Sequence, residues 1–277
     1  MISIKINSVC NRACKFCIDK GGYSFSEIDV EKVASEANNL NEYQKVIITG
    51  GEPFLNIEEV IKLLKAIRPH KKKIVLNTNG SLLSKKNILQ INGLIDELQI
   101  SIHHYDETEN GKVFGSKISF KKIKEALAHK AFTVTVNSTF NKAFKEEERA
   151  FAIDKLVDLV NELGGSNLRL TELKMVNYFD FVEAENFLPA TDPFSNIPRR
   201  ELVEKGCTHT FHRNGVNVSV KRLCSFVEDI YMEHFECNCF DDMRGEFVAN
   251  VITEQTYKVI YGDGKVNDSW IYYHAEN

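Results

Sequence analysis

The sequence predicts an α/β fold, namely a partial (β/α)6 TIM-like barrel that is open on one side. Short apolar runs alternate with amphipathic runs from the N-terminus to about residue 173, and polar residues gather where the apolar runs end. Strands that alternate with helices form a parallel sheet with helices outside it. After residue 174 the alternation stops, and residues 177–200 hold three of the five prolines. We therefore expect a barrel at 1–175, a linker at 176–200 and a small cysteine-containing C-terminal extension at 201–277.

The expected strands are runs of five or six residues rich in Ile, Val and Leu. They lie at Ile2–Ile6, Lys45–Thr49, Lys73–Asn77, Glu97–Ile102, Phe132–Asn137 and Leu168–Glu172. Beyond the barrel, Asn214-Gly215 before the alternating run Val216–Val220 predicts a hairpin turn, because both residues tolerate a positive φ.

The expected helices follow from apolar spacing and from capping residues. They lie at Asp29–Leu40, Asn56–Arg68, Ser84–Ile91, Ser119–Lys130 and Glu147–Leu163. Val30, Val33 and Ala37 fall on one face of the first helix. Asn56 is expected to cap the second helix, which Pro69 stops, and Gly164 ends the last.

Composition excludes several classes of protein. The chain has 277 residues, 43% of them hydrophobic, and a net charge of −4. No strong basic field is present to hold nucleic acid, so an RNA-modifying role is disfavoured. No apolar run is long enough to cross a bilayer, and Lys5, Asn7 and Ser8 interrupt any signal-peptide pattern. We therefore expect a cytoplasmic protein whose seven cysteines serve metal binding or thiol chemistry rather than disulfides.

Cys10, Cys14 and Cys17 form a C-x3-C-x2-C motif directly after the first expected strand. Three thiolates on one short loop can hold three irons of a 4Fe–4S cluster and leave the fourth iron open, whereas an electron-transfer cluster takes four cysteines. Zinc is the first alternative, although no histidine lies nearby to complete four ligands. A disulfide is the second, although it leaves one cysteine over.

With aromatic Phe16 before the third cysteine, this motif resembles the signature of radical S-adenosylmethionine (radical SAM) enzymes. Gly50-Gly51-Glu52-Pro53 resembles the family's stretch that receives the methionine amino group. Further similarities lie at strand ends, at Asn77–Gly80 with Asn79, at Ser101, at Asn137 and at Leu168–Leu173 with Arg169. The last segment is similar to that of the GTP 3′,8-cyclases of molybdenum-cofactor biosynthesis.

The resemblance implies a 4Fe–4S cluster and S-adenosylmethionine as cofactors, with the three cysteines as catalytic metal ligands. Reductive cleavage of the sulfonium then yields a 5′-deoxyadenosyl radical that removes hydrogen from a substrate. The cofactor-binding residues it implies are Phe16, Gly50, Gly51, Glu52, Pro53, Asn79, Ser101, Asn137 and Arg169. Core packing is the alternative for Phe16, helix capping for Glu52 and an acidic ion-pair partner for Arg169.

His103, His104 and Tyr105 end the fourth expected strand and are candidate substrate contacts, as is Glu172 at the end of the sixth. Histidine there could also carry a proton, although a strand-end histidine is often structural.

Cys207, Cys224, Cys237 and Cys239 form a second set in the expected extension. The segment from Cys207 through the hairpin to Cys224 resembles the opening of the auxiliary-cluster domains called SPASM or twitch, although the spacing is longer and the later cysteine block is absent. A second 4Fe–4S cluster is the favoured interpretation. Buried unligated thiols and zinc with His209 or His212 remain open.

Three classes of function are compatible with these residues. The first is a radical SAM enzyme acting on a small molecule or nucleotide, served by an external one-electron reductant such as flavodoxin or ferredoxin. The second is a radical SAM maturase that epimerises or crosslinks a ribosomally made peptide. The third is a non-enzymatic iron–sulfur redox sensor, which the GGEP stretch and the strand-end polar residues disfavour.

Overall fold

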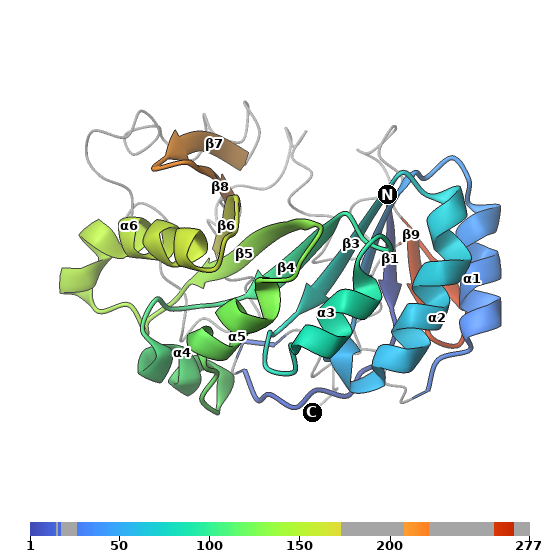
Figure 1. Cartoon of the computed structure of the whole chain (residues 1–277), viewed down its shortest axis with the longest axis horizontal. Helices are drawn as coiled ribbons and strands as arrows, with labels where there is room; N and C mark the ends of the chain where they lie inside the picture. The colour runs from blue at the N-terminus through green and yellow to red at the C-terminus, as the bar shows by residue number, and fades with distance from the viewer. Residues whose placement is uncertain (15, 18–26, 173–207, 222–257, 269–277) are drawn as a thin grey trace, which may run out of the picture.

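The computed structural model describes residues 1–14, 16–17, 27–172, 208–221 and 258–268. Its strands form one twisted sheet in the order β10-β9-β1-β2-β3-β4-β5-β6-β8-β7 (Figure 1). The strands are β1 (Ile2–Lys5), β2 (Lys45–Thr49), β3 (Lys73–Thr78), β4 (Glu97–Ser101), β5 (Thr133–Phe140), β6 (Asn167–Glu172), β7 (Thr208–Arg213), β8 (Val216–Lys221), β9 (Lys258–Tyr261) and β10 (Val266–Asn267). The sheet is not closed, which confirms the expected partial barrel.

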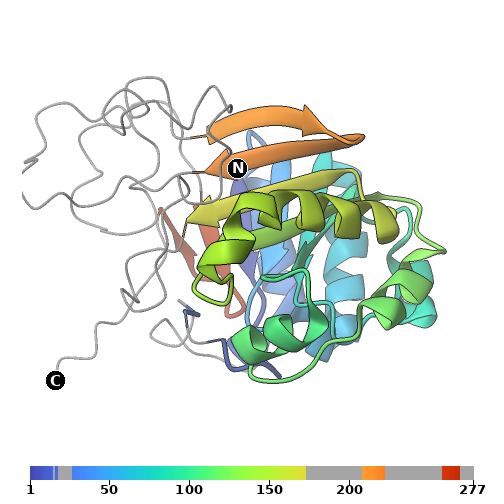
Figure 2. The ribbon, with the colours of Figure 1, turned by 90° about the vertical axis from the view of Figure 1, so that its left-hand side faces the viewer.

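The α-helices lie along one face of this sheet (Figures 1 and 2). They are α1 (Val30–Asn39), α2 (Ile57–Ile67), α3 (Lys85–Ile91), α4 (Glu107–Phe114), α5 (Phe120–Leu127) and α6 (Glu146–Glu162), with 3-10 turns η2 (Pro53–Asn56) and η3 (Arg68–His70). Alternate strand residues such as Ile4, Ile48 and Leu98 join the helices in one fully buried apolar core. We call the opposite face of the sheet, which carries the other strand residues, the inner face.

Strands β1 to β6 pair in parallel in chain order, so their carboxyl ends meet at one edge, called here the mouth. Four strands from the expected C-terminal extension lie in the same sheet. β8 pairs with β6 and β9 pairs with β1, both in parallel, while β7 and β10 form the antiparallel edges. The described part of the extension therefore continues the barrel sheet at both sides.

Most element boundaries lie within three residues of those expected. The predicted hairpin is confirmed, with positive φ at Asn214 and Gly215 between β7 and β8. The structure differs from the expectation at two helices. Helix α4 was missed, although Asp106 caps it by accepting from the backbone N–H groups of Thr108 and Glu109 at 2.7 and 3.0 Å. Asn56 makes no side-chain cap for α2; its Oδ1 instead accepts from Asn7 Nδ2 at 2.8 Å.

Among the described residues, no helix combines the length and the apolar character needed to span a membrane.

Candidate active site

The cysteine loop follows β1 at the mouth. Cys10, Cys14 and Cys17 are half-buried free thiols, and the Cys17 backbone N–H donates to the Cys14 carbonyl at 3.2 Å. Burial raises the pKa of the Cys10 thiol, while the backbone N–H of Arg12 and the side chain of Asn79 oppose that rise. A bound metal would favour the thiolate, which is the ligating form.

Backbone hydrogen bonds anchor the cysteine loop on both sides. On one side, the N–H of Gly51 donates to the Asn7 carbonyl at 3.0 Å and the N–H of Glu52 donates to the Val9 carbonyl at 2.9 Å. On the other, the Ala13 N–H donates to the carbonyl of Phe114, the last residue of α4, at 2.9 Å. The loop is therefore clamped between the end of β2 and the end of α4.

Only glycine fits the first two positions of Gly50–Pro53. Gly50 has a φ of +149°, and a Cβ there would lie 2.7 Å from the Asn7 carbonyl oxygen. A Cβ on Gly51 would lie 2.1 Å from the carbonyl oxygen of Val9. Because glycine has no Cβ, the GGEP turn packs directly on the backbone that leads into the cysteine loop.

Asn7 is a site residue that the sequence interpretation missed. Its side chain is fully buried and accepts from the Gly51 N–H at 3.0 Å while donating to the Glu52 carbonyl at 3.3 Å. A polar residue directly after a buried strand was the available signal, because the carboxyl ends of parallel strands gather the site.

Glu52 is fully buried, and its carboxylate joins the ends of β2 and β3. One oxygen accepts from the Phe54 N–H at 3.0 Å and the Thr78 hydroxyl at 2.8 Å, and the other from the Asn79 N–H at 2.7 Å. Burial raises the pKa of this carboxyl, and these three donors oppose the rise. The expected capping of the following turn is thus present, and one of the roughly four acceptor positions of the carboxylate remains for a ligand amine.

Asn79 connects the end of β3 to the cysteine loop. Its side-chain amide donates to Asn11 Oδ1 at 2.9 Å and lies 3.8 Å from Cys10 Sγ. Ser101, Asn137 and Arg169 form one register row across β4, β5 and β6, so the structure brings these three predicted residues side by side on the inner face.

The residues after β4 separate into two environments. The His103 ring is buried, with ring centroids 4.9 Å from Phe16 and 5.0 Å from Phe114, and its Nδ1 accepts from the Thr139 N–H at 3.3 Å. His104 stacks on Phe144 at 4.4 Å.

Several adjoining polar groups on this side of β4 are hydrogen-bonded, whereas His104 Nε2 is buried without a hydrogen-bond partner among the described residues. The backbone N–H of Asp106 donates to His104 Nδ1 at 3.0 Å, and the Tyr105 hydroxyl donates to Glu148 at 3.1 Å. Burial, together with Glu148, raises the pKa of Tyr105 to about 12. Of these residues, His103 is the one in contact with the cysteine loop.

We expect His103 to make the folded, metal-free protein less stable in mild acid. Burial lowers the pKa of His103 to about 3 from an ordinary 6.5, so between these values the unfolded chain binds a proton that the folded chain does not. This contribution to stability is present above about pH 6.5 and is lost as the pH falls, by about 1 kcal/mol between about pH 7 and pH 5.5. Urea unfolding at the two pH values measures the loss. A His103→Gln variant with the same pH dependence as the wild type would contradict the assignment.

A cavity of about 210 Å³ adjoins the cysteine loop at Phe16. Residues of α4 and of the segment after β5 complete its wall, namely Glu109, Lys112, Val113, Asn141, Lys142 and Ala143.

The remaining predicted site residues have little or no described environment. Cys207, Cys224, Cys237 and Cys239 lie outside the described residues, and for Glu172 and His209 the structure describes only the strand backbone. His212, on β7, is exposed, and its Nδ1 lies 3.0 Å from Asn217 Oδ1.

The donor set of the loop fits an iron–sulfur cluster. Three unoxidised thiols stand on one clamped loop, beside a side-chain amide directed at Cys10, and hydrogen bonds to sulfur are a usual support of such clusters. Within the described ranges, no three His, Cys, Asp or Glu side chains converge as ligands of a single metal ion. A 4Fe–4S cluster places each thiolate on a different iron, so its ligands need no such convergence.

Fold and site together define a parallel α/β partial barrel that carries a loop with three thiols and the adjoining GGEP turn at its mouth. The chain belongs to the radical SAM superfamily, whose family model matches residues 4–156. The superfamily uses a 4Fe–4S cluster and S-adenosylmethionine, so the expected cofactors and the expectation of an enzyme are confirmed at this level.

Curated relatives include a probable GTP 3′,8-cyclase of Saccharolobus islandicus, 29% identical over 63% of this chain and 57% of the relative. An S-adenosylmethionine-dependent nucleotide dehydratase of Fibrobacter sp. is 25% identical over 71% of this chain and 66% of the relative. Streptococcus suis SuiB bound to S-adenosylmethionine shares the fold, with a TM-score of 0.62, 16% identity and coverage of 96% of this chain and 59% of SuiB. The chain thus spans less than two thirds of the length of these proteins.

Proposed function

We propose that this protein reductively cleaves S-adenosylmethionine and abstracts a hydrogen atom from a small-molecule or nucleotide substrate. The observation that carries the proposal is the clamp of Gly51 and Glu52 on the backbone of Asn7 and Val9. It joins the two segments that the chemistry needs, the cluster loop and the turn that receives the methionine amino group. The GTP cyclase and nucleotide dehydratase relatives favour a nucleotide-like substrate.

In this proposal, the cluster and S-adenosylmethionine supply a 5′-deoxyadenosyl radical when bound. The chain binds and orients them. Cys10, Cys14 and Cys17 ligate three irons, and the Gly50–Pro53 turn presents its backbone to the methionine end. Asn79 holds the cysteine loop through Asn11. Ser101 and Asn137 would contact the ribose hydroxyls, and Phe16 would cover the adenine. These assignments rest on the superfamily pattern together with the positions described above.

Anaerobic reconstitution tests this proposal. Iron-loaded, reduced protein should convert S-adenosylmethionine to 5′-deoxyadenosine, slowly even without substrate, as measured by chromatography. Protein with full iron loading that gives no such product would count against the enzyme, and in favour of a redox sensor if its cluster still changes oxidation state. Flavodoxin or ferredoxin in place of a chemical reductant tests the proposed cytoplasmic electron donor.

A peptide maturase is the second candidate. Its support is the likeness in fold to SuiB, a structure also solved with the precursor peptide SuiA. Faster product formation with a nucleotide favours the first candidate, and faster formation with a peptide favours the second. A second cluster on Cys207, Cys224, Cys237 and Cys239 also stays a proposal; iron analysis should give about eight rather than about four irons per chain if it forms.

A further inference from the structure

The inner-facing side chains from β3 to β8 are mostly polar, and they range from buried, as at Gln99 and Thr135, to exposed, as at Arg169. Register rows cross β3 to β8, so the inner-facing side chains stand in layers. One row consists of Asn77, Gln99, Thr135, Asn167 and Asn217, and the next row toward the mouth consists of Ser101, Asn137, Arg169 and Ser219. Such a lining favours a polar ligand, because amide and hydroxyl groups that a ligand covers need new hydrogen-bond partners.

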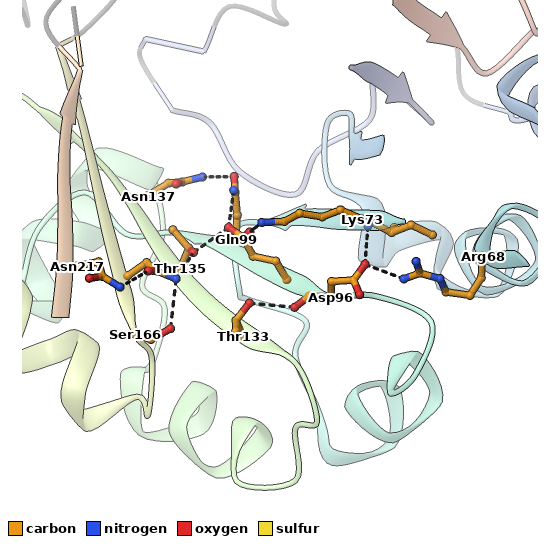
Figure 3. A network of polar contacts seen from close by, with 12 residues as sticks. Arg68, Lys73, Asp96, Gln99, Thr133, Thr135, Asn137, Ser166 and Asn217 are labelled. Carbon is orange, nitrogen blue, oxygen red and sulfur yellow. Dashed lines mark hydrogen bonds and ion pairs between the residues drawn. The ribbon is translucent and has the colours of Figure 1, made fainter. Parts of the chain in front are cut away.

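A chain of hydrogen bonds fixes these layers, as Figure 3 shows. The Lys73 ammonium lies 2.8 Å from Glu97 Oε2, while Gln99 and Thr135 both donate to Glu97 Oε1 at 2.8 Å. Asn137 donates in turn to Gln99 Oε1 at 3.0 Å. Both oxygens of the Glu97 carboxylate therefore have partners, and these bonds, together with its ion pair to Lys73, hold its pKa below the ordinary value against the effect of burial.

Positive charge exceeds negative charge on this face. Among the inner-facing residues of the described strands, Glu97 is the one carboxylate, whereas five residues are cations, namely Lys5, Lys45, Lys73, Arg169 and Lys221. Arg169 and Lys45 are exposed, and neither makes a hydrogen bond or ion pair within the part of the chain that the structure describes. Lys45 and Lys73 are direct register partners on β2 and β3. Burial of part of its side chain lowers the pKa of Lys45, and the charges of Lys73 and Arg169 lower it further, whereas Glu97 opposes the change.

A second observation also indicates a ligand on this face. Asn77 Oδ1 is buried and has no hydrogen-bond partner among the described residues. Buried polar atoms are nearly always paired, and Asn77 is the direct register neighbour of Gln99 in the polar lining. A hydroxyl or N–H group of a bound molecule would satisfy it.

We propose that the inner face of the barrel binds an anionic substrate, with Lys45, Lys73 and Arg169 facing its phosphate or carboxylate group and Asn77 accepting a hydroxyl or N–H group. This rests on the proposed function, because the substrate must extend from the mouth into the barrel. It assigns Arg169 to the substrate rather than to the cofactor. The planar guanidinium suits bidentate binding of either anion.

Titration of the full-length, iron-reconstituted protein with sodium tripolyphosphate and with citrate tests the site by calorimetry. The wild type should bind at least one probe. Tighter binding of tripolyphosphate indicates a substrate that carries phosphate, and tighter binding of citrate indicates a substrate that carries carboxylate. Arg169→Gln and Lys45→Gln should each weaken binding about ten-fold, and Arg169→Lys should weaken it less. Lys86→Gln removes the same charge from the exposed surface of α3 and should leave affinity unchanged. An equal loss of probe affinity in Arg169→Gln and Lys86→Gln would overturn the proposed site. Failure of the wild type to bind either probe would also overturn it.

Anion binding and 5′-deoxyadenosine formation are separate measurements, so they test the anion site and the proposed function independently. Wild-type protein that cleaves S-adenosylmethionine but binds neither probe overturns the anion site alone. Protein that binds tripolyphosphate through Arg169 and Lys45 but, fully iron-loaded, never forms 5′-deoxyadenosine overturns the proposed function and leaves the anion site supported.

Discussion

Replacing Cys14 with alanine is expected to abolish the cleavage of S-adenosylmethionine. Loss of groups that merely hydrogen-bond to metal ligands costs about 10- to 100-fold in activity or metal affinity, so loss of a ligand itself should cost more than about 100-fold. The amount of 5′-deoxyadenosine formed per chain measures the effect. Iron content and absorbance should fall in parallel, because the remaining Cys10 and Cys17 offer too few thiolates to hold the cluster.

Cys239→Ala is the matched control for that substitution, since it removes one thiol from the other cysteine set. It should leave cleavage partly intact while impairing substrate turnover. Equal and complete loss in both variants would show that the two sets do not act separately. Cys14 also contacts the apolar core, so thermal unfolding of both variants must show a cooperative transition before their activities are compared. A fully active Cys14→Ala protein would contradict the assigned cluster loop.

Replacing Gly51 with alanine is expected to be the most damaging change outside the cysteines. Its Cβ would lie 2.1 Å from the oxygen and 2.4 Å from the carbon of the Val9 carbonyl, and both are backbone atoms that no rotamer change can move. Relief would require the GGEP turn to separate from the cysteine loop and to lose the bonds that Gly51 and Glu52 donate. We expect a loss of about 3 kcal/mol in the free energy of unfolding, measured by urea denaturation, together with loss of cluster binding.

Gly93→Ala provides the comparison for this result. Gly93 has a φ of +77°, but an added Cβ there meets no atom within 4 Å. Its cost should therefore be that of backbone strain alone, about 1–2 kcal/mol, with the cluster retained. If Gly51→Ala were no more destabilising than Gly93→Ala and still bound iron, the close packing of the turn on the loop would be refuted.

Sequence periodicity predicted a strand's bounds well where residues that break strands, such as glycine, directly flank the apolar run. β2 runs from Lys45 to Thr49 as expected, since a buried apolar run ends there at Gly50-Gly51. β5 extends three residues beyond its predicted end at Asn137, because β6 pairs with it as far as Phe140 opposite Glu172. Helix α4 escaped prediction since its residues show little apolar periodicity; its cap at Asp106 and its contact with the cysteine loop stabilise it instead.

The local order of residues was enough to determine the three-thiol loop, the glycine turn and the alternation of strands and helices, because each depends on spacing along the chain. Only the tertiary structure decided what those segments do together. The Asn7 side chain accepts a hydrogen bond from Gly51, 44 residues away. Glu52 is held in the core by hydrogen bonds from Thr78 and Asn79 at the end of β3. β9 pairs with β1, although the two strands lie at opposite ends of the sequence. The cationic, polar inner face likewise exists only after β2, β3 and β6 are assembled, since charges and hydrogen bonds act through distance in space rather than through position in the sequence.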